Sequence, residues 1–409
     1  MRDNNITRRR FIKGVSGAAA AACFGAQGRN ISAAPGKSQV LRIDGCPIHD
    51  GERRHAGLDA MLSLMSDSGL RLYRTDKSHR WGGPGGIIAH NDVVLVKVNC
   101  QWKFRGATNT DVVRGLVHRI LEHPDGFSGE VVIFENGQEQ GGFDGDPIAW
   151  GRYKDFPECA GAHVNAEDDG LTVNRLVGDV FANAPVSSFL LDPVCRTFIT
   201  GNDHTTNGFR KIDDAQISYP CFTTKRGNRV ELREGLWTGS GYGGNLKLIN
   251  VPVLKTHAGS GITGALKHCY GIMSMKDDES WIKLRHYKES GSQCGKMYGL
   301  VRMPDITIVD AVWVTPHGHH RGYPPETTHR SNVLLVGLDP VALDYYGSKH
   351  ILLPLGGERA TEHDPDSFPG LVTHINGARD IINAHGGVFG APAHRGDDNI
   401  EVTARPAVL

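Results

Sequence analysis

Residues 92–98 read DVVLVKV, and this run decides the fold class of the chain. Apolar and polar residues do not alternate along it, and such a near-continuous apolar run is typical of a strand buried on both faces of a parallel sheet. After a polar loop at 99–109, Thr110 is the expected N-cap of a segment with helical apolar spacing, and 131–134 (VVIF) predicts the next strand. Together these elements predict a βαβ unit with a right-handed crossover. We therefore expect an α/β fold, with a mostly parallel sheet flanked by helices and with loop-rich insertions.

The remaining chain continues this mixture of strand-like and helix-like segments. Further strands are expected near 186–191, 216–224, 229–233, 305–309 and 332–337. Helices are expected near 58–65, 171–182, 340–350 and 370–385. Outside its two predicted strands, the stretch 193–244 reads as irregular, and neither a repeat nor a low-complexity linker divides the chain. We therefore expect residues 35–409 to form a single elaborated α/β domain.

The composition is that of an ordinary globular protein. Of 409 residues, 39% are hydrophobic and 22% are charged, and 45 basic residues balance 45 acidic ones. This balance gives no electrostatic footprint for nucleic acid or an anionic membrane surface, so we expect neither as a partner. The 52 glycines favour loops and close backbone approaches over a helical bundle.

The first 34 residues read as an export signal rather than as part of the fold. Residues 7–13 (TRRRFIK) place paired arginines before a large apolar residue and a lysine, and an alanine-rich apolar stretch follows at 15–24. This pattern is typical of twin-arginine signals, and it predicts the twin-arginine export machinery as a partner and a periplasmic or otherwise exported location. The apolar run falls short of the ~20 residues that span a bilayer, so we expect no integral membrane span in the mature chain. Lipid attachment at Cys23 is the alternative.

Polar residues stand at the ends of four predicted strands. They are Lys97 and Asn99, Glu135, Lys255 and His257, and Asp310. In open α/β sheets, ligands bind beyond the carboxyl ends of the strands, so these residues suggest one shared cleft. Each residue also has a structural alternative, because charges paired for stability collect at strand ends as well.

The segment at 245–271, NLKLINVPVLKTHAGSGITGALKHCYG, concentrates such residues. An apolar run ends at Lys255, and a helix-like segment that carries Lys267 and His268 follows three spaced glycines. The glycines are Gly259, Gly261 and Gly264. They match the dinucleotide spacing G-x-G-x-x-G, but three polar residues separate them from the strand, so the match is weak. We expect instead that helix N-terminal amides and these lysines, facing Lys97 and Asn99, hold phosphate, carboxylate or sulfate. The alternative is that the glycines only let the helix pack closely on the sheet.

Histidines suggest proton transfer or metal binding in the same cleft. We expect His257 and His268, with Lys255, to be the catalytic residues, because imidazole titrates near physiological pH. The set His257, His268, Asp310 and His317 is the expected metal site, and surface or core histidines are the alternative. His319 and His320 lie in the same loop as His317. No cysteine spacing fits an iron–sulfur cluster, so the cofactor is otherwise unspecified.

Several segments, taken in order, resemble one known family. They are Val94–Asn99 (VLVKVN), Thr110–Arg114 (TDVVR), Pro252–His257 (PVLKTH), Thr263–Lys267 (TGALK), Asp305–Asp310 (DITIVD) and Asn332–Asp344 (NVLLVGLDPVALD). In this order they resemble the family called domain of unknown function 362, over about residues 91 to 350. The resemblance implies an α/β domain, often found beside ferredoxin-like iron–sulfur modules, with no settled activity. This chain departs from the family in lacking the cysteine-rich segment and in having His268 where relatives usually have asparagine.

Three functions remain open at this point. The first is an exported, redox-linked protein that binds a cofactor or a metal-bearing anion in a cleft lined by lysine and histidine. The second is a non-catalytic protein that captures a ligand or assembles a cofactor for a partner. The third is a metal-assisted hydrolase of phosphate or sulfate esters. All three place a small molecule or cofactor in the same cleft.

Overall fold

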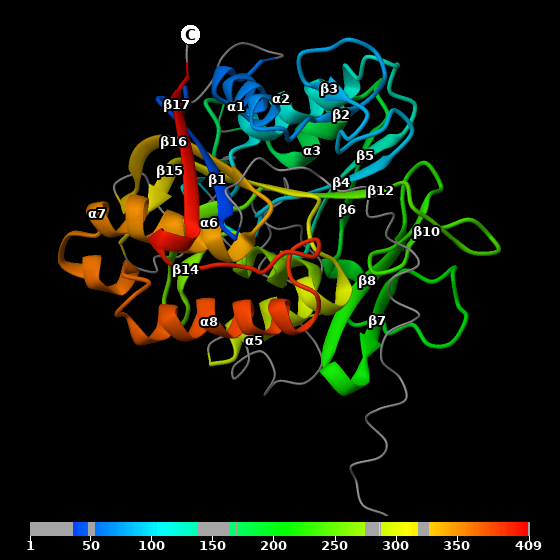
Figure 1. Ribbon diagram of the computed structural model, residues 1–409. Helices are drawn as coiled ribbons and strands as arrows, with labels where there is room; N and C mark the ends of the chain where they lie inside the picture. The colour runs from blue at the N-terminus through cyan, green and yellow to red at the C-terminus, as the bar shows by residue number, and fades with distance from the viewer. Residues whose placement is uncertain are drawn as a thin grey trace, which may run out of the picture.

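The computed structural model describes residues 36–47, 54–102, 104–137, 164–168, 170–274, 286, 288–317 and 327–407. The expected signal at 1–34 and the histidines at 319 and 320 lie outside these ranges. The fold is α/β, as predicted, with a mixed and mostly parallel sheet flanked by helices (Figure 1). In the part of the chain that the structure describes, no helix has the length and apolar character needed to cross a membrane.

The main sheet runs through eight strands in one continuous path. From edge to edge they are β17 (Ile400–Pro406), β1 (Ser38–Asp44), β16 (His329–Gly337), β15 (Ile306–Thr315), β12 (Leu246–Asn250), β4 (Val93–Lys97), β5 (Glu130–Glu135) and β6 (Val186–Leu190). Two further strands, β13 (Val253–His257) and β14 (Gly261–Thr263), leave this path where β13 pairs with β15. Neighbouring strands from β15 through β6 are parallel, whereas β16 is antiparallel to both β15 and β1.

The predicted βαβ unit is confirmed. All five residues of β4 are buried, and α2 (Thr110–Leu121) connects β4 to the parallel strand β5. The N-cap is Asn109 rather than Thr110, because the Asn109 side-chain oxygen accepts the backbone N–H groups of Asp111 and Val112. Two donors that would otherwise be unpaired at the helix start are satisfied in this way.

Helices cover both sides of the sheet. They are α1 (Ala56–Asp67), α2, α5 (Ser290–Lys296), α6 (Pro340–Gly347), α7 (Leu353–Leu355) and α8 (Pro369–Ala384). Figure 1 shows α1 and α2 at the top of the view, with α5 and α8 side by side at the bottom. Short 3₁₀ turns lie at Phe104–Gly106, Asp192–Val194, Asp213–Ala215, Lys267–Ile272, Gly357–His363 and Asp397–Asn399, and π-helical turns at Met297–Val301 and Ser348–Leu352.

Two of the regions that differ from the prediction are 171–182 and 193–244. The segment expected as one helix at 171–182 contains α3 (Val173–Arg175) and a π-helical turn at Leu176–Val180, which includes the poor helix former Gly178. In the region 193–244, the strands predicted near 216–224 and 229–233 are confirmed, but residues expected to be irregular add three more strands, and together they form a second, antiparallel sheet. Its order is β11 (Tyr242–Gly243), β10 (Gly235–Trp237), β9 (Arg229–Glu231), β8 (Ile217–Thr223) and β7 (Gly208–Ile212). A further short pair consists of β2 (Tyr73–Arg74) and β3 (Gly82–Gly83).

Asp310 lies inside a strand, not at the end of one as we expected. β15 continues to Thr315, and its pairing with β16 extends past Asp310. The sheet accommodates this buried carboxylate because its oxygens accept the backbone N–H groups of Asn109 and Val312, at 2.7 and 3.1 Å. Asp310 therefore ties the start of α2 to β15.

Candidate functional site

The lysine- and glycine-rich segment folds as a β-hairpin, which corrects the strand-to-helix junction that we expected. Lys255 and His257 lie within β13, where they pair with Thr263 and Gly261 of the antiparallel strand β14. Gly261 has a φ of 76°, a left-handed conformation that glycine adopts at no steric cost. The N–H of Gly259, in the turn, donates to the His257 ring at 3.1 Å. The glycine spacing therefore serves a hairpin, and the segment that follows, with Lys267 and His268, is a short 3₁₀ helix at Lys267–Ile272 and not the α-helix whose N-terminus a dinucleotide site requires.

The backbone N–H groups that follow this hairpin already donate hydrogen bonds to a carboxylate of the protein. The N–H groups of Ala265 and Leu266 donate to the two oxygens of Asp344, at 2.5 and 3.1 Å. Burial raises the pKa of Asp344 to about 7. Gly264 permits the contact, because a Cβ at this position would lie only 2.2 Å from the Asp344 Oδ1 atom. The amides that we expected to bind an external anion thus hold Asp344, which sequence reasoning did not single out.

The structure brings Lys97, Asn99 and His268 together beside Glu135. The Lys97 ammonium lies 2.5 Å from a Glu135 oxygen, and both side chains are buried. The His268 Nδ1 atom lies 3.1 Å from the Asn99 Oδ1 atom and 3.4 Å from the Lys97 Nζ atom. Bare backbone at Gly271 makes room for the ion pair, because a Cβ there would lie 2.3 Å from Glu135 and 2.4 Å from Lys97. The ends of β4 and β5 therefore carry one connected polar cluster.

Burial changes the titration of two members of this cluster. It raises the pKa of Glu135 to about 8, although the charge of Lys97 acts in the opposite direction. Burial, and then the charge of Lys97, lowers the pKa of His268 well below its ordinary value. His268 is therefore neutral near pH 7 and a weak proton acceptor. Its Nε2 atom lies 3.0 Å from the Lys97 carbonyl, so the imidazole links backbone and side chains without adding charge.

Two further lysines, Lys255 and Lys267, are buried near this cluster. The charges of Glu135, Lys97 and Lys267 all act on Lys255. The Lys255 ammonium donates to the Gly106 carbonyl at 2.6 Å. The Lys267 Nζ atom lies 2.7 Å from the His286 Nε2 atom, which in turn lies 3.1 Å from that of His257. Burial lowers the pKa of Lys255 to about 7, and the charges of Lys267 and Lys97 add to this effect. Burial likewise lowers the pKa of Lys267 to about 8.

Three buried lysines and one buried carboxylate, Glu135, make up this centre. The charge of Glu135 favours the protonated form of Lys255, against the effect of burial. A pocket of about 430 Å³ is lined in part by Gly259 and by His374, whose pKa is lowered by burial and by the charge of Lys267, but the buried lysines themselves do not line it. We call Lys97, Lys255 and Lys267 the buried lysines; they form the candidate functional site.

The residues expected as metal ligands are not gathered in one place. His257 contacts His286, and His268 contacts Lys97 and Asn99. Asp310 accepts backbone N–H groups, and the His317 ring lies 3.1 Å from that of His329. Among the described residues, no three His, Cys, Asp or Glu side chains form a group that could hold a metal ion. The four predicted ligands do not form a metal site because each one contacts a different neighbour.

The fold and the site define an α/β protein whose interior contains three lysines, one of them, Lys255, on a β-hairpin. The family model described as Domain of unknown function (DUF362) matches residues 246–349, so this segment belongs to that family and the resemblance is confirmed there. Neither the curated proteins nor the solved structures contain a match to the chain. The matched segment contains Lys255, Lys267 and Asp344, whereas Lys97 and Glu135 precede it. The candidate site therefore combines the family segment with the preceding βαβ unit.

Proposed function

We propose that the protein is exported and binds an anionic ligand at the buried lysines. The observation that carries the proposal is that Lys97, Lys255 and Lys267 are all buried, and that burial lowers the pKa of Lys255 to about 7 and the pKa of Lys267 to about 8. A buried cation is costly unless it is paired, so a bound anion would favour the protonated form of both amines. The ligand is a phosphate, sulfate, carboxylate or metal-bearing anion. In the last case the metal arrives as part of the anion, and a redox role depends on that metal.

Anion binding is expected to take up protons. At about pH 8, Lys255 is mostly neutral and Lys267 about half protonated, and an anion shifts both pKa values towards the ordinary 10.5. Binding should therefore take up about one proton at that pH and almost none near pH 6, and affinity should fall as pH rises through 7 to 8. Isothermal titration calorimetry with phosphate, sulfate and oxalate, in two buffers of different ionisation enthalpy, measures this uptake.

Matched lysine variants separate this site from general surface charge. Lys267→Met should weaken binding at least about tenfold, because a buried charge contact is lost. Lys225→Met, at an exposed turn between β8 and β9, should bind as the wild type does. Equal affinities in the two variants, or no binding of any of the three anions, would show that the site is not an anion site. Ester turnover that requires added divalent metal would favour the hydrolase instead.

Export is proposed from residues 7–13, which lie outside the described part of the chain. Replacing Arg8 and Arg9 with lysine keeps the positive charge but removes the paired arginines on which twin-arginine export depends. We expect the precursor of this variant to remain in the cytoplasm, as measured by cell fractionation and immunoblotting. Wild-type and variant proteins found in the same compartment would contradict this route.

A further inference from the structure

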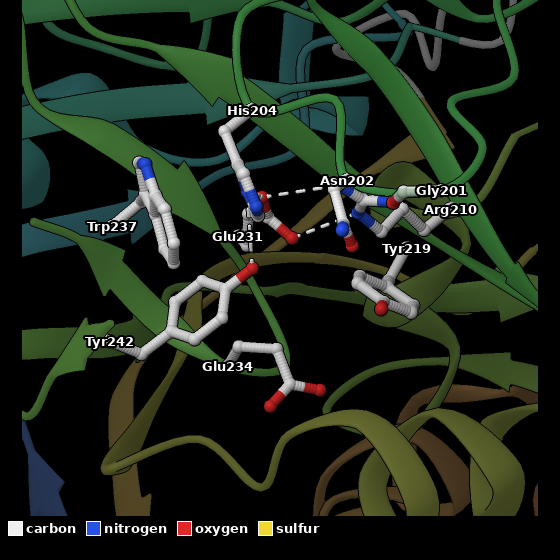
Figure 2. A pocket seen from close by; sticks show the side chains of 9 residues that line it. All are labelled: Gly201, Asn202, His204, Arg210, Tyr219, Glu231, Glu234, Trp237 and Tyr242. Carbon is white, nitrogen blue, oxygen red and sulfur yellow. Dashed lines mark hydrogen bonds and ion pairs between the residues drawn. The ribbon is translucent and has the colours of Figure 1, made fainter. Parts of the chain in front are cut away.

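The five-stranded sheet carries a pocket of about 650 Å³ that the proposed function does not use. Each strand of this sheet contributes one lining side chain, and these are Arg210, Tyr219, Glu231, Trp237 and Tyr242 (Figure 2). Gly201, Asn202, His204 and Glu234 complete the lining. Arg210 is directly opposite Tyr219 in the sheet, and Trp237 is opposite Tyr242, so each pair projects from one face. The pocket precedes residues 246–349 and so lies outside the segment that matches the family.

One buried carboxylate, Glu231, organises the pocket. It accepts a hydrogen bond from the His204 Nδ1 atom at 2.6 Å and one from the Arg210 Nε atom at 2.9 Å. The Tyr242 hydroxyl is a third partner. Burial alone would raise the pKa of Glu231, but these hydrogen bonds outweigh burial and lower it. Glu231 is therefore ionised, and it holds three side chains of the pocket in fixed positions.

The positive charge of Arg210 is already satisfied within the protein. Besides Glu231, its guanidinium donates to the carbonyls of Gly201 and Asp203, at 2.7 and 2.6 Å. The second lining carboxylate, Glu234, is half-exposed and lies 3.7 Å from Arg233, a loose pairing at the surface. Two lining carboxylates thus face one lining guanidinium, which leaves the pocket with a formal negative charge when His204 is neutral.

Aromatic rings form the walls of the same pocket. The His204 ring stacks on Trp237 at 3.8 Å between centroids and 9° between planes, and Trp237 lies 5.1 Å from the exposed ring of Tyr242. Figure 2 shows the rings of Tyr242 and Tyr219 and the Glu234 carboxylate around one open space. Faces of aromatic rings attract cations, and the attraction is strengthened by a nearby carboxylate.

We propose that this pocket is a second binding site, for a small organic cation such as a primary amine or a quaternary ammonium compound. The cationic group lies against the rings of Tyr242 and Tyr219, with Glu234 as its counter-charge. The volume is within the range of about 300–1,000 Å³ that is usual for small-molecule sites. The proposal is independent of the anion site, because none of the buried lysines lines this pocket.

Calorimetry on the mature full-length protein tests the second site, with choline as the probe. Its uncharged isostere, in which a tert-butyl group replaces the trimethylammonium group, is the comparison. We expect choline to bind about tenfold more tightly than the isostere. Glu234→Gln keeps the shape and removes the charge, and Tyr242→Leu removes a ring, so each should weaken choline binding several-fold. Glu358→Gln, an exposed carboxylate in the 3₁₀ turn at Gly357–His363, is the matched control and should have no effect.

Thermal melting of each variant shows whether a loss of binding reflects loss of the fold. Equal affinity for choline and its isostere, unchanged binding by Glu234→Gln, or binding of a neutral sugar in place of choline would each overturn the proposal. Phosphate binding at the buried lysines is measured in the same samples. Because Glu234→Gln should leave phosphate binding unchanged, failure at one site is distinguishable from failure at the other.

Discussion

Replacing Lys97 with methionine is expected to lower the free energy of unfolding by about 3 kcal/mol at about pH 9, where Glu135 is ionised, because removing one partner leaves a buried charge uncompensated. The Lys97 ammonium lies 2.5 Å from Glu135, and both side chains are almost fully excluded from solvent. In the variant, the charge of Lys255 still favours ionised Glu135, and the charge of Asp192 still opposes it. Urea unfolding of the wild type and the variant measures the difference.

The size of this loss should depend on pH. Burial raises the pKa of Glu135 from the ordinary 4.5 to about 8, so the folded protein holds this proton more tightly than the unfolded chain. The resulting stabilisation is complete below about pH 4.5 and is lost as pH rises through about 8. Without Lys97 the folded pKa is higher still, so the deficit of the variant should grow above about pH 8. Unfolding at about pH 6.5 and about pH 9 tests this trend.

A double variant separates the ion pair from simple loss of packing. Lys97→Met with Glu135→Leu replaces both charges with apolar groups, and this exchange is often neutral for a buried pair. We expect it to regain most of the stability that Lys97→Met loses. Additive losses in the double variant, or a Lys97→Met protein as stable as the wild type at both pH values, would contradict the coupling of these two residues.

The parts of the fold that could be predicted are those where burial leaves a continuous apolar pattern. The run at 92–98 and the strand at 131–134 are buried on both faces, and their sequences show it. The hairpin of β13 and β14 was missed because Lys255 and His257 are polar residues inside a buried strand. Polar residues usually indicate a loop, and only tertiary partners such as the Gly106 carbonyl make them acceptable within a strand.

For the candidate site too, one part could be predicted from the sequence and another could not. Strand ends predicted that Lys97, Asn99 and Lys255 would lie in one region, because the carboxyl ends of parallel strands share an edge. The contact between Asp344 and the amides of Ala265 and Leu266 joins residues about 80 positions apart, and no local pattern indicates it. The second pocket takes one side chain from each of five short strands, so its residues carry no common spacing. What these residues bind stays a prediction.

Replacing Gly264 with alanine is the second change for which we expect a large effect, a loss of about 2–4 kcal/mol. The added Cβ would lie 2.2 Å from the Asp344 Oδ1 atom, and moving Asp344 away would leave the N–H groups of Ala265 and Leu266 without their acceptors. Gly264 does not have a positive φ, so backbone strain does not contribute. Gly244→Ala is the matched control, since a Cβ there meets no atom within 4 Å, and should change stability by less than about 0.5 kcal/mol.

The cause of this loss can be tested in an Asp344→Ala background. If Gly264 matters because it admits Asp344, the alanine at 264 should cost little once the carboxylate is absent, and the two losses should be far from additive. The same background leaves the amides of Ala265 and Leu266 open to an external anion, so phosphate should stabilise Asp344→Ala more than the wild type. If the Gly264→Ala variant keeps full stability but loses anion affinity, Gly264 acts in ligand binding, and its contact with Asp344 does not explain its role.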